Sequence, residues 1–439
     1  MKLKRLTACI LALLLVCGLA GCGDDFPGKD ADFYSADGSV AYYITAEHVP
    51  MEPMGTVRAQ VTPLTGEDAR RITGVLFGDR EVYVRDDDLL SRAELVEALA
   101  LWNGFLEPET FQQITQGMQE DDCRYLKQRL QQTVETYEPL LDRVPEEPDR
   151  TKCPWVMEEN LQYGFQSLDG ELVAEEHRYT LWTTLDSQGN SEYGLCLSPR
   201  LDVDGLNSWA WRVQMGSGHI PTEADQQQAR DLTAQYLSAM DLGSWVIDGC
   251  DLTTEGPYGD WGAIIRVTAV PAFSTGPSLR FADRGQALLQ SSATFYFLPG
   301  GALLRVYLTN PQRELEAGPP ESQFTAEQLQ ERAQGFFTEM TPENYGGKSP
   351  NYDAARVTVE GVRYGLRPIP SPSAVGEYTY VPCVSYVGRY DCRNTFSRLV
   401  YGHYADLPDG SNLLLTLDAR DGQPLLDEYD WYTHLLMGD

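Results

Sequence analysis

Apolar residues recur with two different periods along the first third of the chain. Residues 39–45 are strand-like, and in residues 56–61 apolar positions alternate with polar ones, as in a half-buried strand. Over residues 63–148 the spacing becomes helical. Thr65 and Ser91 each begin a sequence like a capping box, in which a hydroxyl and an acidic side chain three residues later cap a helix. These patterns predict N-terminal strands followed by a helix-rich segment.

The pattern returns to strands over residues 149–221, beyond a linker with two prolines at 145–148. Residues 179–185 and 193–197 flank an Asp-Ser-Gln-Gly-Asn connection, whose composition is typical of a hairpin. A further strand is expected at 209–215. We therefore predict a middle β region.

The rest of the chain repeats one order of elements. Thr222 caps a predicted helix, which is followed by two strands and by a hairpin around residues 299–301. Thr325 caps a second helix roughly 100 residues later, again followed by two strands and a closing hairpin at 412–427. One helix packed on a small antiparallel sheet accounts for this order.

The predicted fold class is therefore α+β, with a helix-rich N-terminal part followed by antiparallel-sheet units, each with a packed helix. These units are expected to be duplicated in the C-terminal half. The predicted division is a signal peptide at 1–21, a tether with N-terminal strands at 22–62, the helix-rich segment at 63–148, the β region at 149–221, and helix-plus-sheet units at 222–318 and 319–439.

The closing hairpin, from Leu414 to Pro424, has an Asp-X-X-Asp-Gly turn between two strands. With the elements before it, residues 222–439 resemble PepSY-type units and are similar to YycH and YycI, regulators of a cell-wall histidine kinase. The resemblance implies a curved antiparallel sheet with a packed helix and a non-enzymatic role toward a protein partner outside the cytoplasm. The whole chain also resembles lipoproteins that are common in clostridia-like bacteria. YycH and YycI differ in being held by a membrane helix.

The N-terminus is organised like a bacterial lipoprotein signal. Basic residues at Lys2, Lys4 and Arg5 precede an apolar run at 6–19, which is shorter than the roughly 20 residues of a membrane-spanning helix. The run ends in Leu-Ala-Gly-Cys, which resembles a lipobox. The resemblance implies cleavage before Cys22 and a diacylglyceryl thioether on it, with acyl chains such as palmitate. We therefore predict a lipid-anchored protein on the cell membrane, facing away from the cytoplasm.

Charge and composition limit the classes of partner. The formal charge is −31, and loss of the three basic residues of the signal makes it −34. Such a surface repels phosphate backbones, so we expect no nucleic-acid partner. With 42% hydrophobic residues, the chain can form sizeable cores.

Six of the nine cysteines lie beyond Cys22, and two of them carry a specific prediction. The stretch from Cys383 to Cys392 is symmetric about Val387 and Gly388, so a two-residue turn there would place the cysteines opposite each other. Their Cα atoms would then lie about 4.5 Å apart, which permits a disulfide. Valine is disfavoured in such a turn. The alternative is two thiols more than about 7 Å apart, with no bridge.

No motif predicts catalysis, a cofactor or a metal. The five histidines lie too far apart for a zinc-protease motif, and residues 216–219 lack the spacing of a nucleophile elbow. Residues 346–349 imitate the end of a phosphate-binding loop but follow a helix end rather than a strand. Residues 202–205 lack the later oxygen ligands of a calcium loop. We therefore predict no catalytic, cofactor-binding or metal residue.

Aromatic residues are the class with binding potential. Trp209 and Trp211 would share one side of a strand, and Tyr378 and Tyr380 lie in the last unit. Packing within a sheet is the ordinary role of such residues, and an exposed platform for a glycan or peptide is the alternative. We predict a surface-tethered, non-catalytic binding or regulatory lipoprotein that engages another cell-envelope protein. A carbohydrate- or solute-binding lipoprotein is the alternative.

Overall fold

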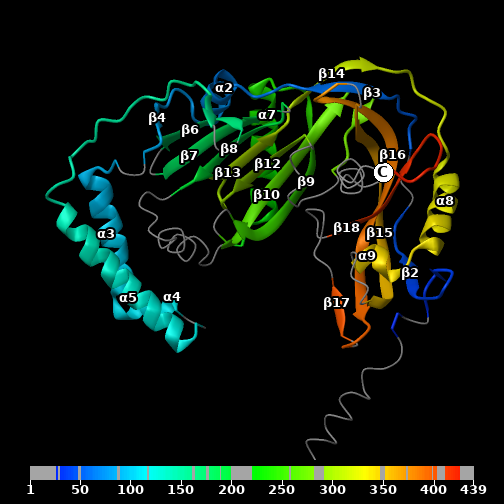
Figure 1. The fold of residues 1–439 in the computed structure, drawn as a ribbon, viewed down its shortest axis with the longest axis horizontal. Helices are drawn as coiled ribbons and strands as arrows, with labels where there is room; N and C mark the ends of the chain where they lie inside the picture. The colour runs from blue at the N-terminus through cyan, green and yellow to red at the C-terminus, as the bar shows by residue number, and fades with distance from the viewer. Residues whose placement is uncertain are drawn as a thin grey trace, which may run out of the picture.

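Two large sheets dominate the structure (Figure 1). The computed structural model describes residues 26–425 except 28–29, 48–50, 87–88, 116–117, 161–163, 175–176, 188, 199–219, 257–258, 281–290, 347–351, 372–373, 398 and 403–410. Strand residues exceed helical ones, at 41% against 28%. The chain is therefore mostly β.

The ten-stranded sheet is antiparallel, in the order β11-β10-β12-β13-β8-β7-β6-β4, with β9 on β10 and β5 on β6. Its strands are β4 (Val82–Val84), β5 (Glu158–Asn160), β6 (Phe165–Ala174), β7 (His177–Asp186), β8 (Ser191–Leu197), β9 (Trp245–Gly256), β10 (Gly259–Phe273), β11 (Gly276–Pro277), β12 (Ser292–Phe297) and β13 (Leu303–Thr309). The hairpins predicted between β7 and β8 and between β12 and β13 are confirmed.

Two helices, α2 (Gly66–Phe77) and α7 (Glu223–Met240), pack on the ten-stranded sheet. Ile72 of α2 and Leu237 of α7 lie in one buried cluster with Phe295 of β12. Burying apolar side chains of this size stabilises a fold by about 1.5–3 kcal/mol each.

The eight-stranded sheet has the order β1-β2-β15-β16-β3-β14, with β17 and β18 also on β16. Its strands are β1 (Phe33–Tyr34), β2 (Val40–Ile44), β3 (Val57–Val61), β14 (Gln312–Ala317), β15 (Tyr352–Pro370), β16 (Glu377–Asn394), β17 (Val400–Gly402) and β18 (Asn412–Asp418). Only β2 and β15 pair in parallel among the strands described in this sheet. Helices α8 (Ala326–Glu339) and α9 (Pro342–Gly346) contribute Phe337 and Tyr345 to its core.

A helical arm extends from the side of the ten-stranded sheet (Figure 1). It consists of α3 (Arg92–Leu106), α4 (Pro108–Ile114), α5 (Glu120–Tyr137) and the short 3-10 helix η1 (Glu138–Leu140). Its own core is centred on Trp102, whose ring lies 5.4 Å from that of Tyr137. In the part of the chain that the structure describes, no helix has both the length and the apolar character to cross a membrane.

All four helix starts predicted from capping sequences are confirmed. Thr65, Ser91, Thr222 and Thr325 each accept a hydrogen bond from the backbone three residues later, and the side chain at that later position caps in return. These bonds satisfy amide groups that have no partner within the helix.

The predicted fold class is wrong. Neither unit at 222–318 or 319–439 is self-contained, because each sheet recruits strands from distant parts of the chain. β14 follows β13 directly but leaves its sheet and pairs with β3, while β13 pairs with β8. In the other sheet, β15 pairs with β2 and β16 with β3. The result is two extended sheets, mostly antiparallel, rather than helix-plus-sheet units after a helix-rich start.

The predicted disulfide is also wrong, because no turn interrupts β16. Cys383 and Cys392 lie nine residues apart on one strand, which places their Cα atoms roughly 30 Å apart, and both thiols are free. Gly388 does not form a turn. It allows the backbone of β15 to lie close to that of β16. A Cβ there would lie 1.9 Å from the carbonyl oxygen of Thr358 on β15. Because glycine has no Cβ, β15 and β16 can stay paired at this position.

The two sheets meet where β11 reaches β15. The Leu279 backbone N–H donates to the Leu366 carbonyl oxygen at 2.9 Å. Beside this contact, the ring of Phe273 on β10 lies 4.5 Å from that of Tyr380 on β16. Within the eight-stranded sheet, the Tyr380 hydroxyl donates to Oε1 of Gln312 on β14 at 2.6 Å, which holds the ring at this contact. Backbone and side-chain contacts thus join the two sheets.

Candidate binding site beneath helix α8

A cavity of about 330 Å³ lies between α8 and the eight-stranded sheet. Leu329, Ala333 and Phe337 project from one face of α8 at four-residue spacing, and all three are buried. Ala333 is the smallest of the three. Between Leu329 and Phe337 it therefore leaves space between the helix and the sheet. Ligand pockets commonly enclose about 300–1,000 Å³ and have mainly apolar walls. The cavity has that size, and most of the residues that line it are apolar or aromatic.

The sheet side of the cavity is apolar and aromatic. β15 contributes Val359 and Val362, on either side of a register shift in its pairing with β16. The ring of Tyr386 on β16 stands edge-on to Phe337, with centroids 5.9 Å apart. Tyrosine is neutral at physiological pH, and burial raises the pKa of Tyr386 further above it.

Tyr364 adds a neutral hydroxyl to the same wall. It donates to Oε1 of Gln323, whose Nε2 donates to the Met54 carbonyl oxygen at 2.6 Å. Burial raises the pKa of Tyr364 as well. The aromatic wall is therefore uncharged and anchored to the segment before β3.

Acidic and amide side chains form the rim. Asp32 and Glu47 lie on the sheet side, and Gln330 and Gln334 lie on α8, all four being exposed. One Asp32 oxygen accepts from the Ile44 backbone N–H at 2.6 Å, which holds this carboxylate beside the opening. An apolar interior with carboxylates at the mouth suits a group that is apolar at its end and positively charged behind it.

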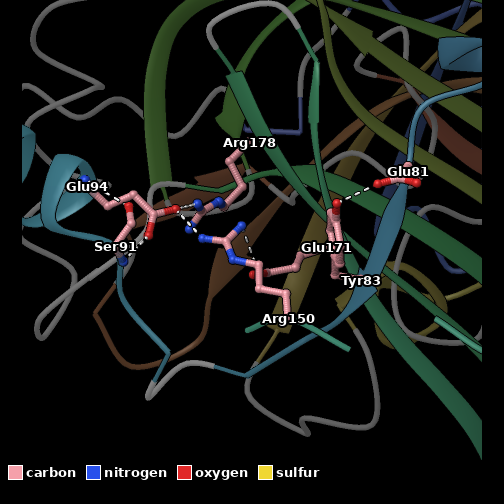
Figure 2. Close-up of polar contacts among 7 residues, drawn as sticks. All are labelled: Glu81, Tyr83, Ser91, Glu94, Arg150, Glu171 and Arg178. Atoms are coloured by element: carbon pink, nitrogen blue, oxygen red, sulfur yellow. Dashed lines mark hydrogen bonds and ion pairs between the residues drawn. The ribbon is translucent and has the colours of Figure 1, made fainter. Parts of the chain in front are cut away.

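A second concentration of polar side chains lies where the helical arm meets the ten-stranded sheet. Figure 2 shows Arg150 and Arg178 converging on Glu94 of α3. Arg150 Nη2 lies 2.6 Å from Glu94 Oε1, and Arg178 of β7 pairs with the same oxygen. Arg150 Nη1 lies 3.6 Å from Glu171 of β6. The four side chains are between 6% and 17% exposed, so these pairs are largely shielded from solvent.

The acid that pairs with both arginines also caps the arm. Glu94 Oε2 accepts from the Ser91 backbone N–H at 2.8 Å, completing the capping box of α3 (Figure 2). Next to the cluster, Tyr83 donates to Glu81 at 2.7 Å, and Lys152 pairs with Glu81. Lys152 lowers the pKa of Glu81, and the hydrogen bond from Tyr83 lowers it further. Opposite charges paired in this way fasten the arm to the sheet, so we interpret the cluster as structural.

The aromatic residues singled out from the sequence do not form an exposed platform. Tyr378 and Tyr380 are 5% and 1% exposed and pack with β3 and β10. Packing within a sheet, the ordinary role of such residues, therefore holds for Tyr378 and Tyr380, and the alternative of an exposed platform fails for them. Ala59 and Val57 of β3 lie opposite them in the sheet, and the ring of Phe273 on β10 packs against Tyr380. Trp209, Trp211 and Cys22 lie outside the described residues. Among the described residues, no three His, Cys, Asp or Glu side chains are placed to hold a metal ion.

The sequence reasoning missed both the cavity and the arginine cluster. The spacing of Leu329, Ala333 and Phe337 indicated a buried helix face, but not that the sheet would leave room beneath it. Arg150 lies at the start of the predicted β region at 149–221, two residues beyond the predicted linker, and Arg178 is 28 residues further along the chain. Only the fold brings the two arginines to Glu94.

Comparisons with known proteins add a structural likeness. No family model matches the chain, and no curated protein matches it. Among solved structures, an uncharacterised protein from Eubacterium rectale is similar over 89% of this chain and 91% of that one. The two sequences are 7% identical, and the TM-score is 0.39. A likeness of this degree carries no functional argument.

Proposed function

We propose that this protein is a non-catalytic binding lipoprotein, tethered by lipid on Cys22, that engages another cell-envelope protein through the cavity beneath α8. The observation that carries the proposal is the apolar cavity with Asp32 and Glu47 at its mouth. The occupant is a peptide segment with one or two apolar side chains and a neighbouring basic residue. The formal charge of −31 favours the approach of such a segment.

The anchor is tested first. In cells given a fatty-acid analogue, the wild-type chain should take up the label, and Cys22→Ser should not. The variant should also keep its signal, because the lipoprotein peptidase cleaves before a lipidated cysteine. Labelling that persists in Cys22→Ser would contradict the anchor.

The cavity is tested with a neutral apolar dye, N-phenyl-1-naphthylamine, added to the folded chain. We expect saturable fluorescence with one site. Gln330→Trp places an indole at the mouth and should weaken binding at least about tenfold, a loss of about 1.4 kcal/mol. Glu331→Trp makes a change of similar size on another face of α8, away from the cavity, and should leave binding unaltered. Equal effects of the two variants would place the dye elsewhere.

The charge of the occupant is tested by displacing the dye with two short peptides, each of two leucines followed by either lysine or glutamate. The lysine peptide should displace the dye at a lower concentration, and the difference should shrink in high salt, which screens Asp32 and Glu47. Exchanging Asp32 and Glu47 for Asn and Gln should remove the preference. A neutral sugar that displaced the dye better than both peptides would favour the solute-binding alternative.

A further inference from the structure

One hairpin end exposes four large apolar side chains close together in the sequence. Phe396, Leu399, Val400 and Tyr401 are 81%, 57%, 47% and 44% exposed, at and beside the turn that joins β16 to β17. Soluble surfaces expose scattered apolar residues, whereas adjacent large ones mark a contact site. This end of the hairpin is the candidate surface.

Hydrogen bonds fix the backbone of this turn. Asn394 Oδ1 accepts from the backbone N–H groups of Phe396 at 2.9 Å and Ser397 at 3.0 Å. The Asn394 N–H in turn donates to the Leu399 carbonyl oxygen at 2.9 Å. A backbone held in this way loses little conformational freedom when the turn enters a contact.

The start of the described chain is attached to the same end of the sheet. Arg393 Nη1 donates to the Phe26 carbonyl oxygen at 3.3 Å, and Arg356 Nε donates to that of Pro27 at 3.0 Å. Both guanidinium groups also lie within 6 Å of the Phe26 ring centre, at 5.8 and 5.3 Å. Arg393 is paired across the hairpin with Val400. Figure 1 shows β17 at this end of the long β15–β16 pair.

The covalent chain then limits where the anchor can lie. Cys22 precedes Phe26 by four positions, so their Cα atoms can be at most about 14 Å apart. Phe26 in turn contacts the residue paired with Val400. A lipid on Cys22 would therefore hold the membrane surface beside the exposed hairpin.

We propose that the hairpin end around Phe396 and Leu399 inserts its apolar side chains into the lipid surface that holds Cys22. This inference rests on the proposed lipid anchor. The hairpin is then a second membrane contact, which fixes the orientation of β15 and β16 relative to the membrane.

The opposite end of the same strands offers a matched control. Val375 lies in the turn between β15 and β16 and is 74% exposed. The length of β16 places it roughly 55 Å from the Phe396 end. A probe at Val375 therefore shares the protein, the anchor and the exposure of a probe at Phe396, but not its distance from Cys22.

The test uses the lipidated full-length chain in vesicles of phosphatidylethanolamine and phosphatidylglycerol. A benzoyl-phenylalanine photoprobe replaces Phe396 in one sample and Val375 in the other. After illumination, lipid adducts are measured by mass spectrometry. We expect adduct yield at position 396 to exceed that at position 375 by at least about tenfold. Both positions are exposed, so each labelled chain should retain the circular dichroism spectrum of the wild type.

Each other outcome has a definite meaning. Equal lipid yields at the two positions would overturn the proposal, as would adducts at position 396 only to protein, which would make the hairpin a protein-binding or self-association surface. Fatty-acid labelling of Cys22 in the same preparation separates the two inferences. Labelled protein without lipid adducts refutes the hairpin contact and leaves the anchor intact. Unlabelled protein refutes the anchor, and with it the hairpin contact that rests on it.

Discussion

At the scale of single residues, Glu94 carries the most specific expectation. Glu94→Gln keeps an oxygen for the Ser91 N–H and so keeps the helix cap, but it removes the negative charge that Arg150 and Arg178 approach. Losing one partner from a shielded ion cluster is costly, because the opposite charges stay desolvated. We expect the free energy of unfolding to fall by about 2–4 kcal/mol in urea titrations.

A neighbouring acid on the same helix is the control. Glu97 is exposed on α3, so Glu97→Gln should change stability by less than about 0.5 kcal/mol. Hydrogen exchange should also quicken in α3 of Glu94→Gln while the eight-stranded sheet keeps its protection. Equal stability of the two variants would show that the cluster does not fasten the arm.

The buried thiols predict a loss of stability at high pH. Burial raises the pKa of both Cys383 and Cys392 to about 12, from an ordinary value of 9.0. Unfolding restores the ordinary value, so between pH 9 and pH 12 the unfolded chain binds fewer protons than the folded one. The stabilisation is fully present below pH 9 and is lost as the pH rises through 12. The free energy of unfolding should therefore decline across this window.

Urea titrations over the pH range measure this decline. The double variant Cys383→Ala, Cys392→Ala should decline less steeply, by up to about 1.4 kcal/mol per pH unit for each thiol removed. The free energy of unfolding of this variant near neutral pH measures separately the stability lost when the two buried thiols no longer fill their space. Parallel slopes for the variant and the wild type would mean that the thiols do not cause the decline. Burial of Tyr193 raises its pKa too and contributes in the same direction.

At the scale of elements, the capping box of α8 controls the helix above the cavity. Thr325 accepts from the Gln328 backbone N–H, and Gln328 Oε1 accepts from that of Thr325 at 2.9 Å. Thr325→Ala should lower the free energy of unfolding by about 1 kcal/mol, whereas Thr325→Ser retains the hydroxyl and should change it little. Dye binding should weaken in the alanine variant, because Leu329 lies in the turn that frays. Unaltered exchange rates in that turn would contradict this.

Hairpins and helix starts are the elements that sequence patterns located well. The hairpin around Pro299, Gly300 and Gly301 is an example, because both glycines adopt positive φ values of 90° and 88° in the turn. Such turns depend on a few adjacent residues. The same reasoning failed at Val387 and Gly388, where glycine serves the close passage of β15. A glycine in a strand-like sequence is compatible with a turn or with the close approach of a neighbouring strand, and only the pairing of the strands shows which of the two occurs.

At the scale of the whole molecule, each sheet contains strands from distant segments of the chain, so no one of these segments can form its sheet alone. Residues 222–318 expressed alone would leave β13 without β8 and β14 without β3. Unpaired strand edges and uncovered apolar faces favour aggregation. We expect this fragment to lack cooperative thermal unfolding by circular dichroism, whereas residues 23–439 unfold cooperatively. A fragment with native-like near-ultraviolet signals and a sharp transition would show that it is an independent unit.

The sequence by itself determined the features that depend on neighbouring residues. Four helix starts followed from capping sequences, and two hairpins followed from turn composition. The lipid anchor at Cys22 is a prediction of the same local kind, awaiting its labelling experiment. In each case the interactions that decide the outcome span only a few positions, so a pattern in the chain reports them directly.

Tertiary structure alone decided the sheet partners, and with them the fold class and the site. Alternating apolar residues mark a strand but are compatible with any partner, so nothing local shows that β3 pairs with β14 and β16. The pairing with β3 places Tyr378 and Tyr380 inside the sheet, and the pairing of β2 with β15 brings segments from both ends of the chain around the cavity beneath α8. Strand pairing depends on contacts between residues far apart in the chain. The spacing of apolar side chains within one strand does not identify the strand with which it pairs.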